Sequence, residues 1–360
     1  MTSIHSFPAA RYLLTAKRTT NAMLSRVANS LYWIGRYVER AENIARLLDV
    51  NLNLLLDFVH LDDELLKELW VPILRSAGCE EDFFKAYEKA DSQSVTEFIT
   101  FDPNNPSSIL SCLFSARENA RQIRDQITSE MWECINESYL FLKSKNAKEV
   151  WNSGAHNFYD QIKKSSHLFQ GLINSTFSRG EGYRFIQFGK YLERADMTTR
   201  MLDIKYHILL PQVSDVGGAV DTVQWRAVLR SVSALDAYRQ FYVDDILPTK
   251  VAEFLIFSEN FPRSIRFCLH HVDDYFHQIT VTNVGIYRTV EERSFGKLLS
   301  DLNFLSIDEI IKSGLHEYLM NVQDVLKNLG QFIYESFIYY PPTDIAEEIR
   351  LFQQETQQQQ

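Results

Sequence analysis

Proline and glycine are scarce in this chain, with 9 and 13 residues among 360. Both residues interrupt helices, so their scarcity permits long, uninterrupted helical segments. The four cysteines show no CxxC spacing, which argues against a zinc site or a disulfide framework. Cys112 and Cys268 lie in the apolar segments ILSCL and IRFCL, and we predict that they are buried and reduced.

Several classes of protein are excluded by what is missing. No run approaches the roughly 20 apolar residues of a membrane helix, and no stretch has the apolar centre of a secretory signal. We therefore expect a cytoplasmic protein without membrane contact. The formal net charge of −10 argues against a nucleic-acid partner. Phosphate-loop, dinucleotide and hydrolase-elbow motifs are absent, so no cofactor is expected and a nucleotide site would have to come from another chain.

An internal repeat organises what is present. GRYVERAENIARLLD (35–49) returns as GKYLERADMTTRMLD (189–203), with eight of fifteen positions identical and an offset of 193 − 39 = 154. Later segments recur in the same order, from Trp70 and Trp225 and then from Val95 and Val251. These repeats predict an all-α helical bundle built from two tandem, diverged repeats packed with pseudo-twofold symmetry. Repeat one would span about 23–170 and repeat two about 178–342.

The ends of the chain are expected to lie outside this bundle. Residues 1–22 are predicted to be a disordered leader, or Met23 is the natural start. Residues 343–360 are predicted to be a disordered, Gln-rich tail. Within the bundle we expect long helices over 115–144 and 306–338, and a helix interrupted near Gly285 over 279–287.

The repeated helix has a polar face opposite its apolar face. At about 100° per residue the polar face carries Glu39, Arg40, Glu42, Asn43, Arg46 and Asp49. One interpretation is an ordinary solvated face with a Glu42–Arg46 pair. The other is a buried polar seam or a binding site, because the Glu-Arg pair, the later Arg and the Asp recur in the second copy.

Four segments together resemble the alpha-E family of helical domains, named for its helices and its ER motif. They are MLSRVANSLYWIGRYVERAEN, SARENARQIRDQITSEMWE, FGKYLERADMTTRMLD and FPRSIRFCL, and the resemblance spans about 23–341. It implies a partnership with circularly permuted ATP-grasp proteins and with transglutaminase-like peptidases, in ATP-dependent synthesis or modification of peptides or amides. The residues that it points to are Glu39, Arg40, Glu193, Arg194, Arg117, Glu118, Arg121 and Arg263. Position 107, the counterpart of Arg263, is Ser, so two identical sites are not expected.

The Glu and Arg of one ER pair point about 100° apart, so each must find its partner on another helix. Glu39 and Glu193 are the catalytic candidates, as general bases. An arginine can hold a carboxylate or phosphate by two hydrogen bonds. The candidates for this role are Arg40, Arg46, Arg194 and Arg200. The structural alternative is an interhelical Glu–Arg network.

Two further clusters of charged residues are weaker candidates for a functional site. Arg117, Arg121 and Arg124 recur at i, i+4 and i+7 beside Glu118, which is typical of an anion site, a docking surface or a solvated face. The histidines and aspartates of 270–277 superficially match metal spacing, but no complete ligand set is present and no metal is predicted.

Three functions are consistent with these observations. The first is an accessory or substrate-binding module acting with an ATP-grasp amide or peptide ligase. The second is an enzyme in its own right, using the ER-motif Glu and Arg residues on peptide or amide substrates. The third is a helical scaffold without a ligand site. Because the chain lacks a nucleotide motif, catalysis by this chain alone is the less favoured reading.

Overall fold

The computed structural model describes residues 23, 25–57, 70–207, 218–243 and 246–338. These residues form helices and connecting turns without any strand, which confirms the all-α prediction. The predicted leader (1–22) and tail (343–360) lie outside the described residues.

The first part of the chain forms helices in this order: α2 (Ser25–Asp57), α4 (Trp70–Ser76), α5 (Glu80–Ala86), α6 (Ser92–Thr100), α7 (Ile109–Gln122), η1 (Arg124–Gln126), α8 (Ser129–Lys143), α9 (Ala147–Ser153) and α10 (Ala155–Thr176). The second part forms α11 (Glu181–His207), α12 (Ala219–Ser231), α13 (Leu235–Tyr242), α14 (Pro248–Phe257), α15 (Ile265–Thr280), α16 (Val290–Phe304), α17 (Ile307–Ser313), α18 (Leu315–Ile333) and the π-helical turn η3 (Tyr334–Ile338).

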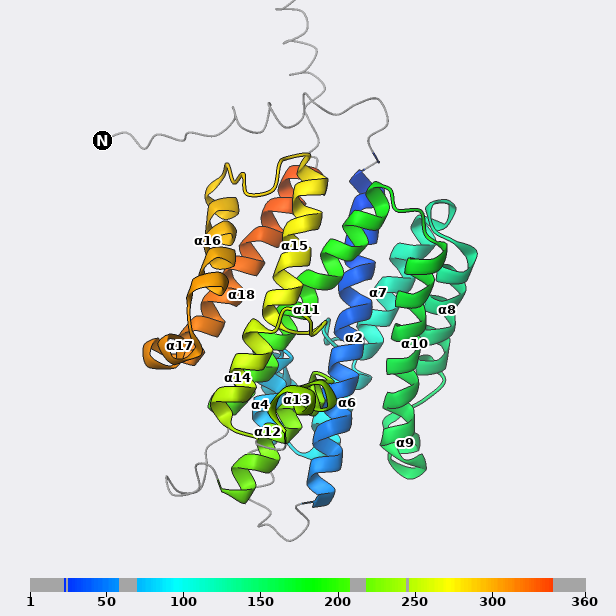
Figure 1. The fold of residues 1–360 in the computed structure, drawn as a ribbon. Coiled ribbons are helices and arrows are strands. Elements are labelled where there is room, and N and C mark those ends of the chain that lie inside the picture. The colour runs from blue at the N-terminus through cyan, green and yellow to red at the C-terminus, as the bar shows by residue number, and fades with distance from the viewer. Residues whose placement is uncertain (1–22, 24, 58–69, 208–217, 244–245, 339–360) are drawn as a thin grey trace, which may run out of the picture.

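The two ER helices, α2 and α11, pack against each other at the centre of the bundle (Figure 1). Glycine permits the contact. A Cβ atom on Gly35 would lie 2.2 Å from the carbonyl oxygen of Ile186, and one on Gly189 would lie 2.3 Å from that of Tyr32. Since real Cβ atoms essentially never approach so closely, the two backbones touch only because both positions lack a side chain.

The remaining helices cover this central pair from two sides. α7, α8 and α10 stand on the α2 side, whereas α15, α16 and α18 stand on the α11 side (Figure 1). As a result, the polar face of α2 is enclosed: Glu39, Glu42, Asn43, Arg46 and Asp49 are all buried. The interpretation of this face as solvated is therefore wrong.

Two of the expected long helices are broken. The segment 115–144 splits because Ile123 leaves helical geometry and Thr128 caps α8 by accepting a hydrogen bond from the Met131 N–H. The segment 306–338 splits at Gly314, whose φ of +109° ends α17. The segment 279–287 is mostly a turn, because α15 ends at Thr280 and the next helix begins at Val290.

The cysteine prediction is confirmed. Cys112 and Cys268 are fully buried and free, and Cys79 and Cys134 are also free and almost fully buried. Burial raises the pKa of the Cys112 and Cys268 thiols to about 12, so both remain protonated at neutral pH.

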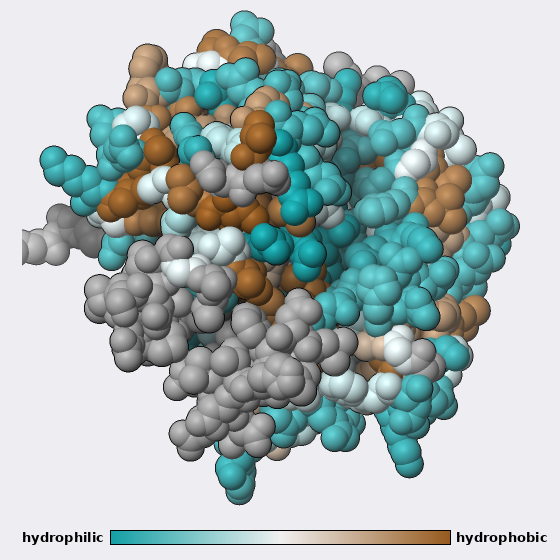
Figure 2. Space-filling model, turned by 60° about the horizontal axis from the view of Figure 1, so that its bottom comes forward, coloured by the Kyte–Doolittle hydropathy of each residue, from teal (hydrophilic) through white to brown (hydrophobic). Residues whose placement is uncertain are grey.

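None of the helices in the described part of the chain combines the length and the apolar character needed to cross a membrane. Figure 2 shows the lower end of the bundle, where hydrophilic residues cover much of the surface and surround a hollow to the right of its centre. Hydrophobic residues are confined to smaller patches on this face.

Candidate functional site

The two ER motifs exchange partners across the α2–α11 contact. Arg194 donates from Nε and Nη2 to the two carboxylate oxygens of Glu39, at 2.8 and 2.7 Å. Arg40 donates in the same way to Glu193, from Nε at 2.5 Å and from Nη2 at 3.0 Å. Each glutamate is therefore held by the arginine that follows the other glutamate, as the predicted interhelical network requires.

Each of the two carboxylates also accepts a hydrogen bond from a second arginine. These second arginines come from different parts of the chain. Arg263, at the turn before α15, donates to Glu39 at 2.8 Å. Arg36, one turn before Arg40 on α2, donates to Glu193 at 2.7 Å. Both glutamates are fully buried, and both are paired with two guanidinium groups.

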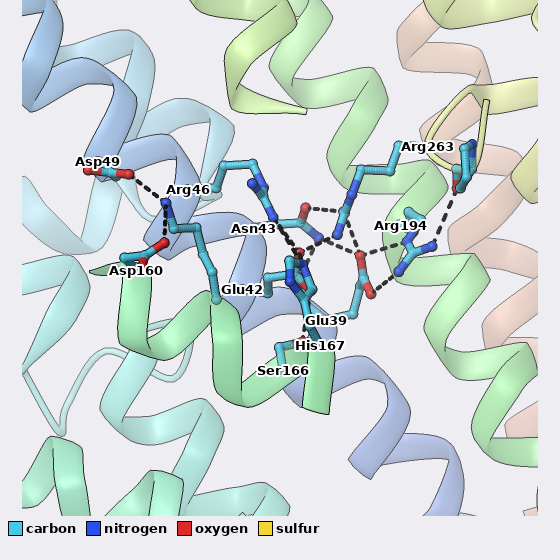
Figure 3. A network of polar contacts seen from close by, with 12 residues as sticks. Glu39, Glu42, Asn43, Arg46, Asp49, Asp160, Ser166, His167, Arg194 and Arg263 are labelled. Atoms are coloured by element: carbon cyan, nitrogen blue, oxygen red, sulfur yellow. Dashed lines mark hydrogen bonds and ion pairs between the residues drawn. The ribbon is translucent and has the colours of Figure 1, made fainter. Parts of the chain in front are cut away.

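The network on the Glu39 side continues along α2 (Figure 3). Arg263 also donates to Asn43 and to Glu42. Glu42 accepts further hydrogen bonds from Arg46 at 2.6 Å and from Ser166 of α10 at 2.8 Å. The network around Glu39 and Glu42 is therefore enclosed by interactions with both α10 and the turn before α15.

These contacts determine the ionisation of the glutamates. Burial alone would raise the pKa of Glu193, but the guanidinium groups of Arg40 and Arg36 lower that pKa to about 2. Burial likewise opposes ionisation of Glu39, whereas Arg194 and Arg263 lower its pKa. The pKa of Glu42 lies well below its usual range because Arg263, the His167 hydrogen bond and Arg46 outweigh its burial.

A general base works best with a pKa near the operating pH. Glu39 and Glu193 have lowered pKa values and already accept hydrogen bonds on both carboxylate oxygens. Neither property suits a general base. The geometry instead supports a structural role, in which each glutamate holds two arginines in fixed positions.

Some of these arginines face a cleft of about 820 Å³ between α2, α11 and α18. Arg36 and Arg40 line it from α2, and Arg200 lines it from α11. Trp33 and Tyr37 of α2 also line the cleft, with their rings stacked at a centroid distance of 5.2 Å. A volume of this size suits a small organic ligand.

The cleft arginines keep unused hydrogen-bond donors. Arg40 uses Nε and Nη2 for Glu193, while Arg36 uses Nε for Glu193 and Nη1 for Tyr32. Arg200 uses Nε for Asp196. The other guanidinium nitrogens of these three arginines have no hydrogen-bond partner among the described residues, so the cleft offers donors that suit an anionic group.

The cleft extends beyond this cluster. A cavity of about 290 Å³ adjoins it and shares Arg200, Met320 and Gln323 with it. Lys327 of α18 adds a fourth cation to the wall of the larger cleft.

The residues expected to form one binding set lie in two separate places. Arg40 and Arg200 line the cleft, whereas Arg46, Arg194 and Arg263 belong to the buried network on the Glu39 side. Arg36 and Lys327 were not predicted. Arg36 had a signal, because its counterpart at the 154-residue offset, Lys190, is also basic.

The arginines of α7 lie apart from this cleft. Arg117 donates to Asn136 of α8 and to Glu118, and Arg121 pairs with Glu118. Arg124 lies on η1 beyond the end of α7, so the i, i+4, i+7 spacing does not place all three arginines on one helix. In the described part of the chain, no His, Cys, Asp and Glu side chains are grouped as a metal site would need.

The fold and the site together define an all-helical domain centred on reciprocal Glu–Arg pairs. Residues 23–338 match the Alpha-E family, described as a predicted alpha-helical domain with a conserved ER motif, and the chain belongs to this family.

The curated relatives are uncharacterised proteins. One from Mycobacterium bovis and one from Mycobacterium tuberculosis are each 26% identical over 262 residues. The aligned region is 69% of this chain but only 29% of each relative, so this chain corresponds to a minor part of those longer proteins. No solved structure gives a significant match.

Proposed function

We propose that this domain is an accessory module that binds an anionic group of a substrate for an ATP-grasp amide or peptide ligase. The observation that carries the proposal is the cleft in which Arg36, Arg40 and Arg200 present N–H donors that no described residue occupies. A carboxylate or phosphate would be held there by charge-assisted hydrogen bonds.

The ER network supports this role by fixing the donors in place. Arg36 and Arg40 share the buried carboxylate of Glu193, so neither side chain has to be ordered when the ligand binds. Preorganisation of this kind increases affinity because less conformational entropy is lost on binding.

We also propose that the two halves are tandem repeats related by a pseudo-twofold axis. The exchanged ER pairs and the mutual glycine contacts support this arrangement, as does the same order of helices after α2 and α11. Because Ser107 stands where the second half has Arg263, only the Glu39 side gains an arginine from this turn. The open ligand site is thus on the Glu193 side.

The circularly permuted ATP-grasp partner, and a transglutaminase-like peptidase as a second partner, are part of this proposal. The chain carries no nucleotide-binding motif of its own, and its curated relatives contain much additional sequence. A catalytic role for Glu39 or Glu193 is less well supported, since their pKa values are lowered by paired arginines.

The test is ATP turnover by the cognate ATP-grasp protein, with and without this domain, over a set of amino acids and short peptides. We expect stimulation that Arg200→Gln and Lys327→Gln reduce while melting stability is kept. Arg121→Gln on α7 is the matched control and should behave as the wild type. If the domain neither binds the ligase nor alters its turnover, the accessory role is refuted. If Arg121→Gln alone removes stimulation, the site lies on α7.

A further inference from the structure

Lys190 of α11 is a buried lysine that has no anionic partner among the described residues. The residue is only 6% exposed, and its Nζ lies 4.2 Å from the centre of the Tyr191 ring. No carboxylate of the described segments forms an ion pair with it, although its counterpart Arg36 pairs with Glu193. The equivalent carboxylate, Glu39, is already occupied by Arg194 and Arg263.

Burial and neighbouring arginines disfavour the positive charge of Lys190. Burial and the nearby Arg194 lower the pKa of the Lys190 amine to about 7. The charged and titratable groups that influence it come from α2, α11 and α15 and from the turn before α15. They are Glu39, Arg194, Arg263, Cys268 and His271.

The hydrogen-bonded network around Glu39 and Glu42, next to Lys190, contains more positively than negatively charged side chains. It contains two glutamates, Glu39 and Glu42, and three arginines, Arg46, Arg194 and Arg263, so its net charge is 2 × (−1) + 3 × (+1) = +1. Buried charges are stable when they are balanced by charges of opposite sign. A protonated lysine would worsen this imbalance, whereas a single negative charge at Lys190 would remove it.

A donor without a partner lies on the same face of α11. The side-chain Nε2 of Gln187, one turn before Lys190, is buried and has no hydrogen-bond partner in the described part of the chain. A buried donor of this kind needs an acceptor, such as a water or a bound group.

We propose that Lys190 is a carbamylation site, at which the neutral amine adds carbon dioxide. The nitrogen lone pair forms a bond to the carbon of CO2, one C=O π pair moves to oxygen, and the amine loses one proton to solvent. The product is a lysine carbamate with one negative charge. CO2 is small and uncharged, which suits a largely buried amine.

The test uses the full chain, equilibrated with ¹³C-bicarbonate at pH 7 and examined by ¹³C NMR. An amine with a pKa of about 7 is half neutral there, which is about a thousandfold more than an ordinary lysine with a pKa of 10.5. We expect a carbamate resonance that Lys190→Met removes. Lys164→Met, at an exposed lysine of α10, should retain the resonance.

Alkylation of the wild-type adduct with a trialkyloxonium salt, followed by peptide mapping, locates the carbamate even if Lys190→Met fails to fold. A label on Lys190 supports the proposal. The absence of a carbamate at pH 7, or a label only on other amines, overturns it.

Discussion

The contact between the two ER helices predicts a strong effect from adding one methyl group at Gly35 or Gly189. In Gly35→Ala the new Cβ would lie 2.2 Å from the Ile186 carbonyl oxygen, against at least 3.4 Å in an ordinary contact. The helices would have to separate locally by about 3.4 − 2.2 = 1.2 Å. Both atoms in this clash are fixed by helical backbone, so rotation of a side chain cannot relieve it.

The expected cost in unfolding free energy is the sum of three contributions, two unfavourable and one favourable. Overpacking a tightly packed interior destabilises proteins by about 1–3 kcal/mol. Replacing a helical glycine by alanine stabilises the helix by about 1 kcal/mol, because alanine has the higher helix propensity. Separation of the helices would also lengthen the hydrogen bonds of both ER pairs, so we expect Gly35→Ala to lose about 2 kcal/mol or more of unfolding free energy. Gly189→Ala should lose a similar amount.

The assay is chemical denaturation followed by far-UV circular dichroism, with Gly171→Ala as the matched control. Gly171 lies within α10, where an added Cβ would meet no atom within 4 Å, so this variant should be neutral or gain up to about 1 kcal/mol. One separation of the helices relieves both clashes, so the double variant should cost less than the sum of the single variants. If Gly35→Ala is as stable as Gly171→Ala, the two backbones are not in contact.

Three further predictions concern the buried charges. Glu193→Gln removes the anion shared by Arg36 and Arg40 and should cost about 3–5 kcal/mol of unfolding free energy in chemical denaturation. The folded-state pKa of Glu193 is lowered to about 2 from 4.5, so its contribution to stability is present above pH 4.5 and is lost as the pH falls towards 2, measurable by denaturation at stepped pH. The pKa of Lys190 is lowered to about 7 from 10.5, so its protonated form disfavours folding. Without an adduct, Lys190→Met should exceed the wild type in stability at pH 6, by a margin that shrinks between pH 7 and pH 10.5.

Each of these has an outcome that contradicts it. Glu118→Gln, at a partly exposed pair on α7, should change stability by about 1 kcal/mol or less. An equally small effect of Glu193→Gln would mean that its arginines are not held by a buried charge. Acid unfolding of equal steepness in Glu193→Gln and the wild type would rule out the proposed role of this carboxylate. A Lys190→Met variant that is less stable than the wild type at pH 6 would show that the protonated amine is well solvated or paired.

The central features of the fold could be predicted because they repeat within the chain. The recurrence of GRYVERAENIARLLD identified α2 and α11 as two segments of similar sequence, and their periodicity identified them as helices. The breaks at Ile123 and Gly314 were missed for different reasons. Ile123 has no helix-breaking character, whereas Gly314 was a visible signal that the apolar pattern of 306–338 obscured.

The partners of the buried charges were less predictable, because each carboxylate requires two arginines and only one is specified by the ER motif. Arg263 lies 224 positions after Glu39, and no sequence pattern connects them. The second arginine of Glu193 comes instead from the same helix as Arg40, through Arg36. The different origin of the second arginine has physical consequences around both glutamates. Where Arg263 is the second arginine, the carboxylate of Glu39 is fully occupied and Lys190 has no anionic partner among the residues that the structure describes. Where Arg36 is the second arginine, two guanidinium groups remain at the edge of a cleft, and the same motif that stabilises the fold can present donors to a ligand.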